Sequence, residues 1–184
     1  MFIGREVVVT EKMDGECTTI YKGGCHARSI DTSSHPSRER VKALAGQLAY
    51  RLPDDWRIVG ENVYAQHSIA YDALPAHFLA FGLHVGDGLV TSWDQLMSHC
   101  VIKMQLCPVP TLYRGIWDEE KVRSCWTGRS MFGDTQEGYV VRLADAFMFD
   151  LFPKCVAKYV RADHVQTDEH WMHKPVVPNK LKRR

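Results

Sequence analysis

The chain has 184 residues, 45% of them hydrophobic, and its 23 Lys and Arg residues nearly balance 22 Asp and Glu residues. This length allows one sizeable core but not two full domains, so we expect one domain, residues 1–162, and a short tail, residues 163–184. The formal net charge of +1 excludes an overall basic protein. Any contact with nucleic acid must therefore rely on an uneven placement of charge.

No hydrophobic stretch approaches the roughly 18 residues of a membrane-spanning helix, and charge already appears at Arg5 and Glu6. We therefore expect no signal peptide and no membrane association. The six cysteines are scattered without a C-x-x-C pair, which favours reduced thiols and a cytoplasmic protein. The tail ends in a basic run at residues 180–184, which could be a solvated end or an arm that contacts phosphates.

The N-terminal part of the chain reads as strands. Residues 6–11 and 17–21 are runs rich in β-branched residues, and the KMDGE segment between them contains the turn-favouring pair Asp14-Gly15. Lys12 is thus expected at a strand end or in the connection. A third strand is expected over residues 25–30.

The middle of the chain alternates a helix with longer strands. Residues 33–36 (SSHP) predict the start of a helix that runs to about Arg51, with apolar residues at helical spacing. Residues 56–64 and 77–85 are apolar runs of strand length. Gly86-Asp87-Gly88 joins the second run to LVTSW as a predicted hairpin.

The C-terminal part adds helices and strands. Ser92 can cap a helix over residues 93–104, and Asp118 can cap another over residues 119–126. Two further strands are expected at residues 137–143 and 155–160. Many strands with a few helices, and no regular β-α-β alternation, predict an α+β fold of mainly antiparallel sheets with flanking helices.

The segment Lys12-Met13-Asp14-Gly15 is a weak pattern alone, because Asp-Gly is common in turns. It stands first, however, in an ordered series. The series is EKMDGE at 11–16, ARS at 27–29, GENVYAQHSIAY at 60–71, FGLHV at 81–85, EGYVVR at 137–142 and VAKYVR at 156–161. It resembles the collinear motifs of the covalent nucleotidyltransferase superfamily of ligases and capping enzymes, most closely those of ATP-dependent RNA ligases.

The resemblance spans nearly the entire chain and implies the ATP-grasp-like adenylation domain of a ligase. It implies that Lys12 attacks the α-phosphate of ATP and holds AMP through a phosphoramidate bond, and that Lys158 binds that phosphate as a second catalytic residue. The attack needs a neutral amine. Nearby cations, such as a metal ion, Arg28 or Lys158, would favour that form.

The resemblance also implies the residues that bind ATP or AMP. Glu11 would read the adenine edge, Phe81 would stack on the adenine, and Glu61 would accept hydrogen bonds from the ribose. Arg28 would bind the sugar or phosphate end as a charged fork, and Gly15 would let the backbone approach the nucleotide. The full set is Glu11, Lys12, Asp14, Gly15, Arg28, Glu61, Phe81, Glu137, Lys158 and Arg161.

Glu137 is the candidate metal ligand, for Mg²⁺ or Mn²⁺, because these ions accept carboxylate and water oxygens. The chain departs from the family pattern near its last motif. Family members often have a second lysine two residues after the first, and this chain has Val160 there. Arg161 follows, but strand alternation would point it away from the Lys158 face.

The implied function is that of an RNA ligase, active in RNA repair, that joins a 5′-phosphate end to a 3′-hydroxyl end. A capping guanylyltransferase or DNA ligase is one alternative, although the 23 residues after Arg161 are too few for the barrel that follows in those families. A non-catalytic module that binds nucleotides or RNA ends is another. A protein partner could supply RNA affinity, and we expect removal of residues 179–184 to leave Lys12 chemistry nearly unchanged.

Overall fold

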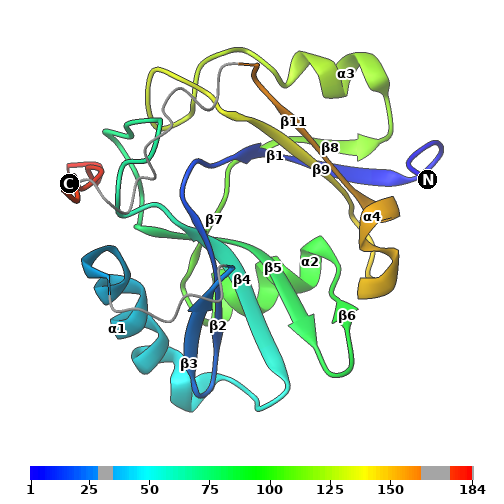
Figure 1. The fold of residues 1–184 in the computed structure, drawn as a ribbon. Helices are drawn as coiled ribbons and strands as arrows, with labels where there is room; N and C mark the ends of the chain where they lie inside the picture. The colour runs from blue at the N-terminus through cyan, green and yellow to red at the C-terminus, as the bar shows by residue number, and fades with distance from the viewer. Residues whose placement is uncertain (29–34, 163–174, 184) are drawn as a thin grey trace.

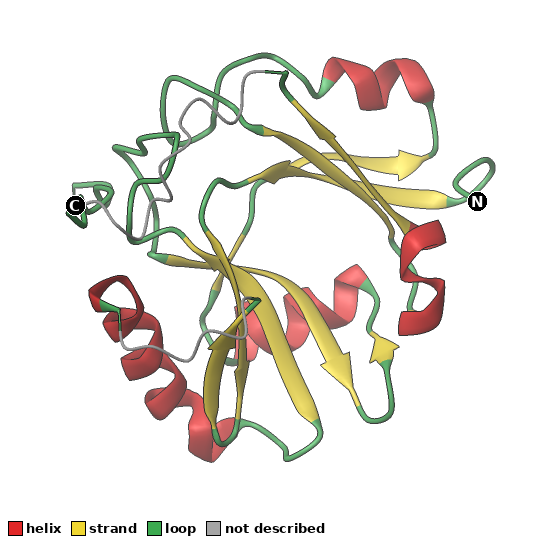
Figure 2. Ribbon diagram, in the orientation of Figure 1, coloured by secondary structure: helices red, strands yellow, loops and turns green. Residues whose placement is uncertain are grey.

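The computed structural model describes residues 1–28, 35–162 and 175–183. Within them, two β-sheets lie one above the other (Figures 1 and 2). The first is an antiparallel sheet with the strand order β11-β9-β1-β8. Its strands are β1 (Glu6–Lys12), β8 (Thr111–Ile116), β9 (Gly138–Leu143) and β11 (Val156–Val160).

The second sheet has the order β10-β6-β5-β4-β2-β3, and β7 pairs with β5 in parallel. Its strands are β2 (Glu16–Tyr21), β3 (Gly24–Ala27), β4 (Trp56–Asn62), β5 (Phe78–Val85), β6 (Leu89–Val90), β7 (Cys107–Pro108) and β10 (Phe147–Met148). The described residues thus form the α+β fold with mainly antiparallel sheets that the sequence predicts.

Short helices flank the two sheets (Figure 2). The helices of the described residues are η1 (Pro36–Arg38), α1 (Glu39–Leu48), η2 (Ala49–Arg51), α2 (Trp93–Leu96), η3 (Met97–Lys103), α3 (Glu119–Ser124), η4 (Phe149–Leu151) and α4 (Phe152–Cys155). Helices α1 and α2 bury apolar residues in one core cluster with β4 and β5. Val122 of α3 packs in a second cluster with β1 and β9.

Strand β1 contributes to both clusters and so orients the site. Val8 belongs to the cluster of the second sheet, whereas Val7 and Val9 belong to the cluster that includes α3. Because side chains alternate along a strand, Thr10 and Lys12 share the face of Val8. Lys12 is therefore on the face that looks toward the second sheet.

The helix starts predicted at Ser92 and Asp118 are confirmed, whereas residues 33 and 34 of the third predicted start lie outside the described residues. The Ser92 side chain accepts a hydrogen bond from Gln95 N in a complete capping box, and the Asp118 side chain accepts bonds from two backbone N–H groups at the start of α3. After one turn, however, the first of these helices widens into η3, a π-helical segment. There the Met104 N–H donates to His99 O at 3.1 Å, five residues back.

Other boundaries differ from the sequence-based expectation. Strands β1 and β2 lie in different sheets, so Met13 to Gly15 cross between sheets and do not form a hairpin. Strand β8 was not expected, because prolines at 108 and 110 precede it and Gly115 interrupts its pattern. Strand β8 pairs with β1 from Glu6 to Thr10. Its backbone therefore takes up the hydrogen-bonding groups along one edge of β1, the strand that ends at Lys12.

The C-terminal segment 175–183 packs against the loop that follows β4, near the point marked C in Figure 1. Asn179 is 3% exposed, so this part of the chain is not a freely solvated end. The boundary expected at 162/163 adjoins residues outside the described part and stays a prediction. Within the described residues, no helix has the length and apolar character needed to cross a bilayer.

Candidate functional site

Lys12 ends β1 and lies opposite Gly138 at the start of β9. This pairing brings Lys12 beside Glu137, and Lys12 Nζ donates to Glu137 Oε1 and Oε2, each at 2.6 Å. The Glu137 side chain is 6% exposed and that of Lys12 is 25% exposed, so the ion pair is largely shielded from water. The two opposite charges therefore attract each other more strongly than they would in open water.

Gly138 is required by the packing of β9 on β11. A Cβ atom at this position would lie 2.0 Å from Tyr159 O, a distance that no side chain can adopt. Glycine thus lets the two strands approach closely enough to hold the backbone of Glu137. The next residue after β11, Arg161, adds a further backbone bond, because its N–H donates to Glu137 O at 3.0 Å.

Glu61 on β4 is the second carboxylate near Lys12. Burial raises its pKa to about 8, the charge of Lys12 opposes this shift, and the charge of Glu137 adds to it. The three groups therefore lie within electrostatic reach of one another although their strands belong to different sheets. A carboxyl group whose pKa is raised by burial and lowered by a nearby lysine charge is a candidate functional group.

Asp14 anchors the crossing between the two sheets. Its Oδ2 accepts hydrogen bonds from Ser68 N, Ser68 Oγ and Ile69 N, at 2.8, 2.8 and 2.7 Å. Its backbone N–H donates to the hydroxyl of Tyr71 at 2.8 Å. In this structure Asp14 thus fixes the backbone two residues after Lys12, a contact that the sequence did not predict.

Gly15 also has a structural reason for being glycine. A Cβ atom there would lie 2.6 Å from Asn62 O, so the chain could not pass this close to the end of β4 with any side chain. The sequence suggested instead that glycine serves close approach of a nucleotide. The contact with Asn62 accounts for the glycine without a ligand.

Glu11 is 2% exposed, and its carboxylate accepts hydrogen bonds from the Ser130 hydroxyl and from Met131 N, the latter at 3.0 Å. Burial raises its pKa, and the two bonds lower it in part. Its partners come from the loop between α3 and β9, which sequence reasoning left unassigned. Gln136 closes this loop by accepting from Thr127 N and donating to Gly138 O.

Lys158 is exposed and lies on β11 opposite Val140, which in turn lies opposite Thr10 of β1. Directly opposed residues of an antiparallel sheet share a face. Lys158 therefore projects from the same face of the first sheet as Lys12, as the sequence-based hypothesis requires. Arg161 lies one residue beyond β11.

Arg28 and Phe81 enter from the second sheet. The Arg28 N–H donates to Cys17 O at 2.9 Å, and Cys17 lies opposite Glu61 between β2 and β4. Burial raises the pKa of the Cys17 thiol to about 11; Glu61 raises it further, whereas Arg28 and Lys12 lower it. Phe81 lies at a bulge of the β4–β5 pair and packs, partly buried, against the core.

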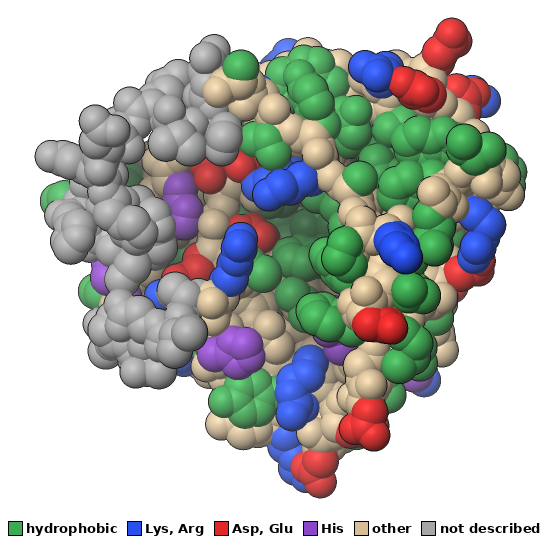
Figure 3. Space-filling model, turned by 45° about the vertical axis from the view of Figure 1, so that its right-hand side comes forward, with side chains coloured by type: hydrophobic (Ala, Val, Ile, Leu, Met, Phe, Trp, Pro, Cys, Tyr) green, Lys and Arg blue, Asp and Glu red, His purple; other side chains and the backbone are tan. Residues whose placement is uncertain are grey.

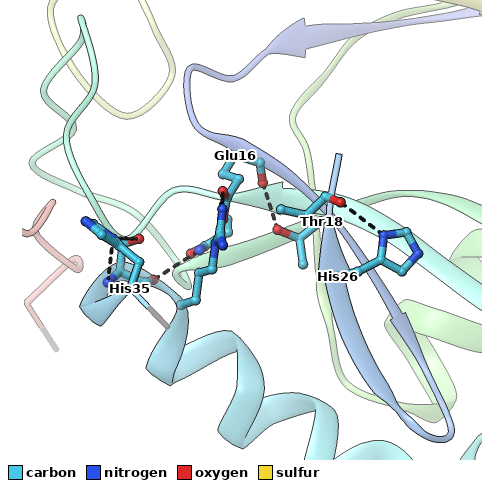
Figure 4. Close-up of polar contacts among 8 residues, drawn as sticks. Glu16, Thr18, His26 and His35 are labelled. Atoms are coloured by element: carbon cyan, nitrogen blue, oxygen red, sulfur yellow. Dashed lines mark hydrogen bonds and ion pairs between the residues drawn. The ribbon is translucent and has the colours of Figure 1, made fainter. Parts of the chain in front are cut away.

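A second ion pair joins Glu16 of β2 to Arg38, the residue before α1. Arg38 Nε donates to both carboxylate oxygens of Glu16 at 3.1 and 2.9 Å, and Arg38 Nη2 also donates to Oε1. Glu16 lies at the start of β2, and Arg38 directly precedes α1; His35, labelled with Glu16 in Figure 4, caps the short helix η1 before it. This pair joins α1 to the chain that leaves the crossing.

Figure 3 shows a hollow in the surface that is lined by hydrophobic side chains and bordered by acidic and basic ones. Among the described residues no three His, Cys, Asp or Glu side chains converge as a metal-binding group. A metal ion at Glu137 would therefore keep most of its water ligands, which is how Mg²⁺ is commonly held beside phosphates. The carboxylates near Lys12 fit that use.

Residues 5–160 match the family model described as RNA ligase. The chain belongs to the RNA ligase family. The motif series recognised in the sequence is thereby confirmed at the level of the family. A search of the curated proteins found no match.

Solved structures give the fold of this RNA ligase family member independent support. The chain is similar to the Naegleria gruberi RNA ligase in a variant with ATP and Mn, at 17% identity and a TM-score of 0.60, covering 86% of this chain and 50% of that one. For the same ligase with PPi the values are 19%, 0.57, 83% and 52%. For a putative ATP-dependent DNA ligase from Aquifex aeolicus they are 19%, 0.56, 86% and 44%. The chain spans about half the length of these proteins.

Proposed function

We propose that this RNA ligase family member is an ATP-dependent RNA ligase that carries AMP on Lys12. The observation that carries the proposal is the position of Lys12 at the end of β1. Its Nζ contacts both oxygens of Glu137, and Glu61 lies within electrostatic reach. Lys158 projects from the same sheet face as Lys12, so two lysines can act on one phosphate.

ATP and a divalent metal ion, Mg²⁺ or Mn²⁺, are the proposed cofactors. Structures of the Naegleria gruberi RNA ligase contain ATP with Mn, AMP with Mn, or PPi, and those ligands support the same chemistry here. Glu137 is the proposed residue for the metal, through its carboxylate and bound water. Such an ion would neutralise phosphate charge as the reaction proceeds.

The ion pair determines the order of the first events. Lys12 must separate from Glu137 and release its proton to solvent before its Nζ can act as a nucleophile. The Nζ lone pair then forms a bond to the α-phosphorus, the P–O bond to pyrophosphate breaks, and pyrophosphate leaves. Lys158 would stabilise the charge on the phosphate oxygens during this exchange.

Two further transfers complete the proposed cycle. AMP passes from Lys12 to the 5′-phosphate of an RNA strand, and the 3′-hydroxyl of a second strand then displaces AMP and seals the ends. RNA with these ends, from a repair process in the cytoplasm, is the proposed substrate, and a protein partner could supply RNA affinity. Family membership supports an RNA substrate.

The remaining nucleotide contacts are proposals that the positions support to different degrees. Glu61 lies within electrostatic reach of Lys12, and with a pKa of about 8 its carboxyl group can donate to a ribose hydroxyl as well as accept from it. Phe81, proposed to stack on the adenine, lies on β5 of the second sheet. Arg28, proposed to bind a phosphate or the sugar, directly follows β3 of the same sheet. Glu11 for the adenine edge would have to share its carboxylate with Ser130 and Met131.

Labelling with radioactive ATP or GTP and divalent metal, followed by a denaturing gel, tests the proposal. We expect label from ATP and none from GTP, and we expect Lys12→Ala and Lys12→Arg to abolish it, because arginine cannot supply a neutral amine. Lys42→Ala, an exposed lysine on α1, should label like the wild type. Label from GTP would indicate a capping enzyme, and wild-type labelling of Lys12→Arg would exclude this nucleophile.

A sealing assay tests the second half of the proposal. Nicked RNA, free RNA ends and nicked DNA, each with 5′-phosphate and 3′-hydroxyl, should be compared at equal concentrations. We expect sealing of at least one RNA substrate and slower sealing of all-DNA nicks. Preference for the all-DNA nick would support a DNA ligase, and labelling without any sealing would support a module that only binds nucleotides or ends.

A further inference from the structure

The C-terminal segment 175–183 runs along the loop of residues 63–74 and bonds to it through the backbone. The Gln66 N–H donates to Val177 O at 2.8 Å, and the Lys180 N–H donates to Tyr71 O at 2.9 Å. The Leu74 N–H donates in turn to Lys180 O at 3.0 Å. The segment thus fastens the loop on which the partners of Asp14 lie.

Asn179 is the buried centre of this contact. Its Oδ1 accepts from Tyr71 N at 2.7 Å, and its Nδ2 donates to Val63 O at 2.9 Å and to Ala65 O at 3.4 Å. Its own N–H donates to Tyr64 O at 2.8 Å. With 3% of its surface exposed, the amide has little access to water, so its loss would leave these loop groups without partners.

The same loop reaches the nucleophile through Asp14. Tyr71, whose N–H is bonded by Asn179, also accepts the Asp14 N–H at its hydroxyl. Ser68 and Ile69 donate to the Asp14 carboxylate from the same loop. A continuous path of hydrogen bonds therefore runs from the C-terminal segment to the residue two positions after Lys12.

We propose that Asn179 is a positioning residue for Lys12, which it holds in place through the loop of residues 63–74 and Asp14. This inference rests on the proposed function of Lys12. The crossing at Met13 to Gly15 is short and has no sheet partner of its own, so the hydrogen bonds from the loop hold Asp14, its middle residue, in place. A nucleophile displaced by about 1 Å can lose on the order of 100-fold in rate.

The proposal also changes what a truncation should do. Removal of residues 179–184 was expected from the sequence to spare Lys12 chemistry, but that deletion includes Asn179. Truncation should therefore slow adenylylation itself and not only strand sealing. Any effect of the basic side chains at 180, 182 and 183 on RNA has to be tested with Asn179 in place.

The experiment measures single-turnover labelling of Lys12 over a range of ATP concentrations, in the full chain. We expect Asn179→Ala to lower the rate at saturating ATP by about 10-fold or more, with less than a threefold change in the ATP concentration for half-maximal rate. Val122→Ala, in the apolar cluster under α3, serves as the destabilised control. Rates are compared at a temperature where both variants are fully folded by circular dichroism.

A double-mutant cycle separates positioning from general destabilisation. Tyr71→Phe removes only the hydroxyl that accepts from Asp14 N. If Asn179 acts through this loop, the combined variant should lose clearly less than the product of the two single effects. Wild-type rates in Asn179→Ala, equal slowing in Val122→Ala, or independent effects in the cycle would each overturn the proposal.

Amide hydrogen exchange gives a readout that does not need Lys12 chemistry. In Asn179→Ala the amides of Asp14, Ser68 and Ile69 should exchange faster than in the wild type, while amides of α3 keep their protection. Unchanged exchange at these three amides would overturn the proposal. If the wild type takes no label, the proposed function fails, and this exchange result alone still decides whether Asn179 holds the loop.

Discussion

Replacing Glu61 by glutamine should make the free energy of unfolding less dependent on pH. Glu61 has a pKa of about 8 in the folded protein against 4.5 as the ordinary value. Between these two values the folded state keeps a proton that the unfolded state has released. The stability contributed by this group is therefore complete below about pH 4.5 and is lost as pH rises through about 8.

The magnitude follows from the two pKa values. At about 1.36 kcal/mol per pH unit, the full difference corresponds to about 5 kcal/mol. The side chain keeps partial contact with water, and screening reduces the effect, so we expect roughly 2 to 4 kcal/mol. Glu61→Gln should thus match the wild type near pH 4.5 and exceed its stability by that amount near pH 9.

Urea unfolding at several pH values between 4.5 and 9 measures this difference directly. Glu120→Gln, an exposed glutamate in α3, is the control and should change stability little and equally at every pH. A stability difference for Glu61→Gln that does not grow with pH would refute the reasoning. It would mean that Glu61 is well solvated and does not share the electrostatic environment of Lys12.

Two further predictions concern the supports of the site. Arg38→Met leaves the Glu16 carboxylate buried without its partner, and we expect it to lower the free energy of unfolding in urea by about 3 to 5 kcal/mol; a loss under about 1 kcal/mol would show that solvent screens the pair. Gly138→Ala should lower stability by more than about 2 kcal/mol because its Cβ meets Tyr159 O. Gly46→Ala, with open space around it, should raise the melting temperature by a few degrees. Equal effects of the two glycine variants would contradict the packing argument.

The sequence predicts those parts of the fold that local chemistry controls. The helix caps at Ser92 and Asp118, the long strands β4 and β5, and the Gly86–Gly88 hairpin all depend on neighbouring residues, and all are present in the structure. The position of Lys12 at a strand end follows from the same local pattern. Only the resemblance to a family predicted that Lys12 and Glu137, 125 residues apart, belong to the same site.

The remaining parts depend on contacts between distant segments. Nothing local to Asp14 indicates that its carboxylate bonds to residues 68 and 69. An Asp-Gly pair is also what an ordinary turn contains. Asn179 gave no signal either, since a polar residue near basic ones normally reads as solvent-exposed. The contact between Ser130 and Glu11 likewise forms only because β1 and β9 pair and bring the two segments together.

The most direct test of the account is to locate the site of AMP attachment. The purified protein is incubated with ATP and Mg²⁺ or Mn²⁺, digested under conditions that preserve phosphoramidates, and mapped by tandem mass spectrometry. The account predicts AMP on the peptide that contains Lys12 and on no other lysine. AMP on Lys158 or another lysine, or no adduct at any metal concentration, would contradict the central claim that Lys12 is the nucleophile.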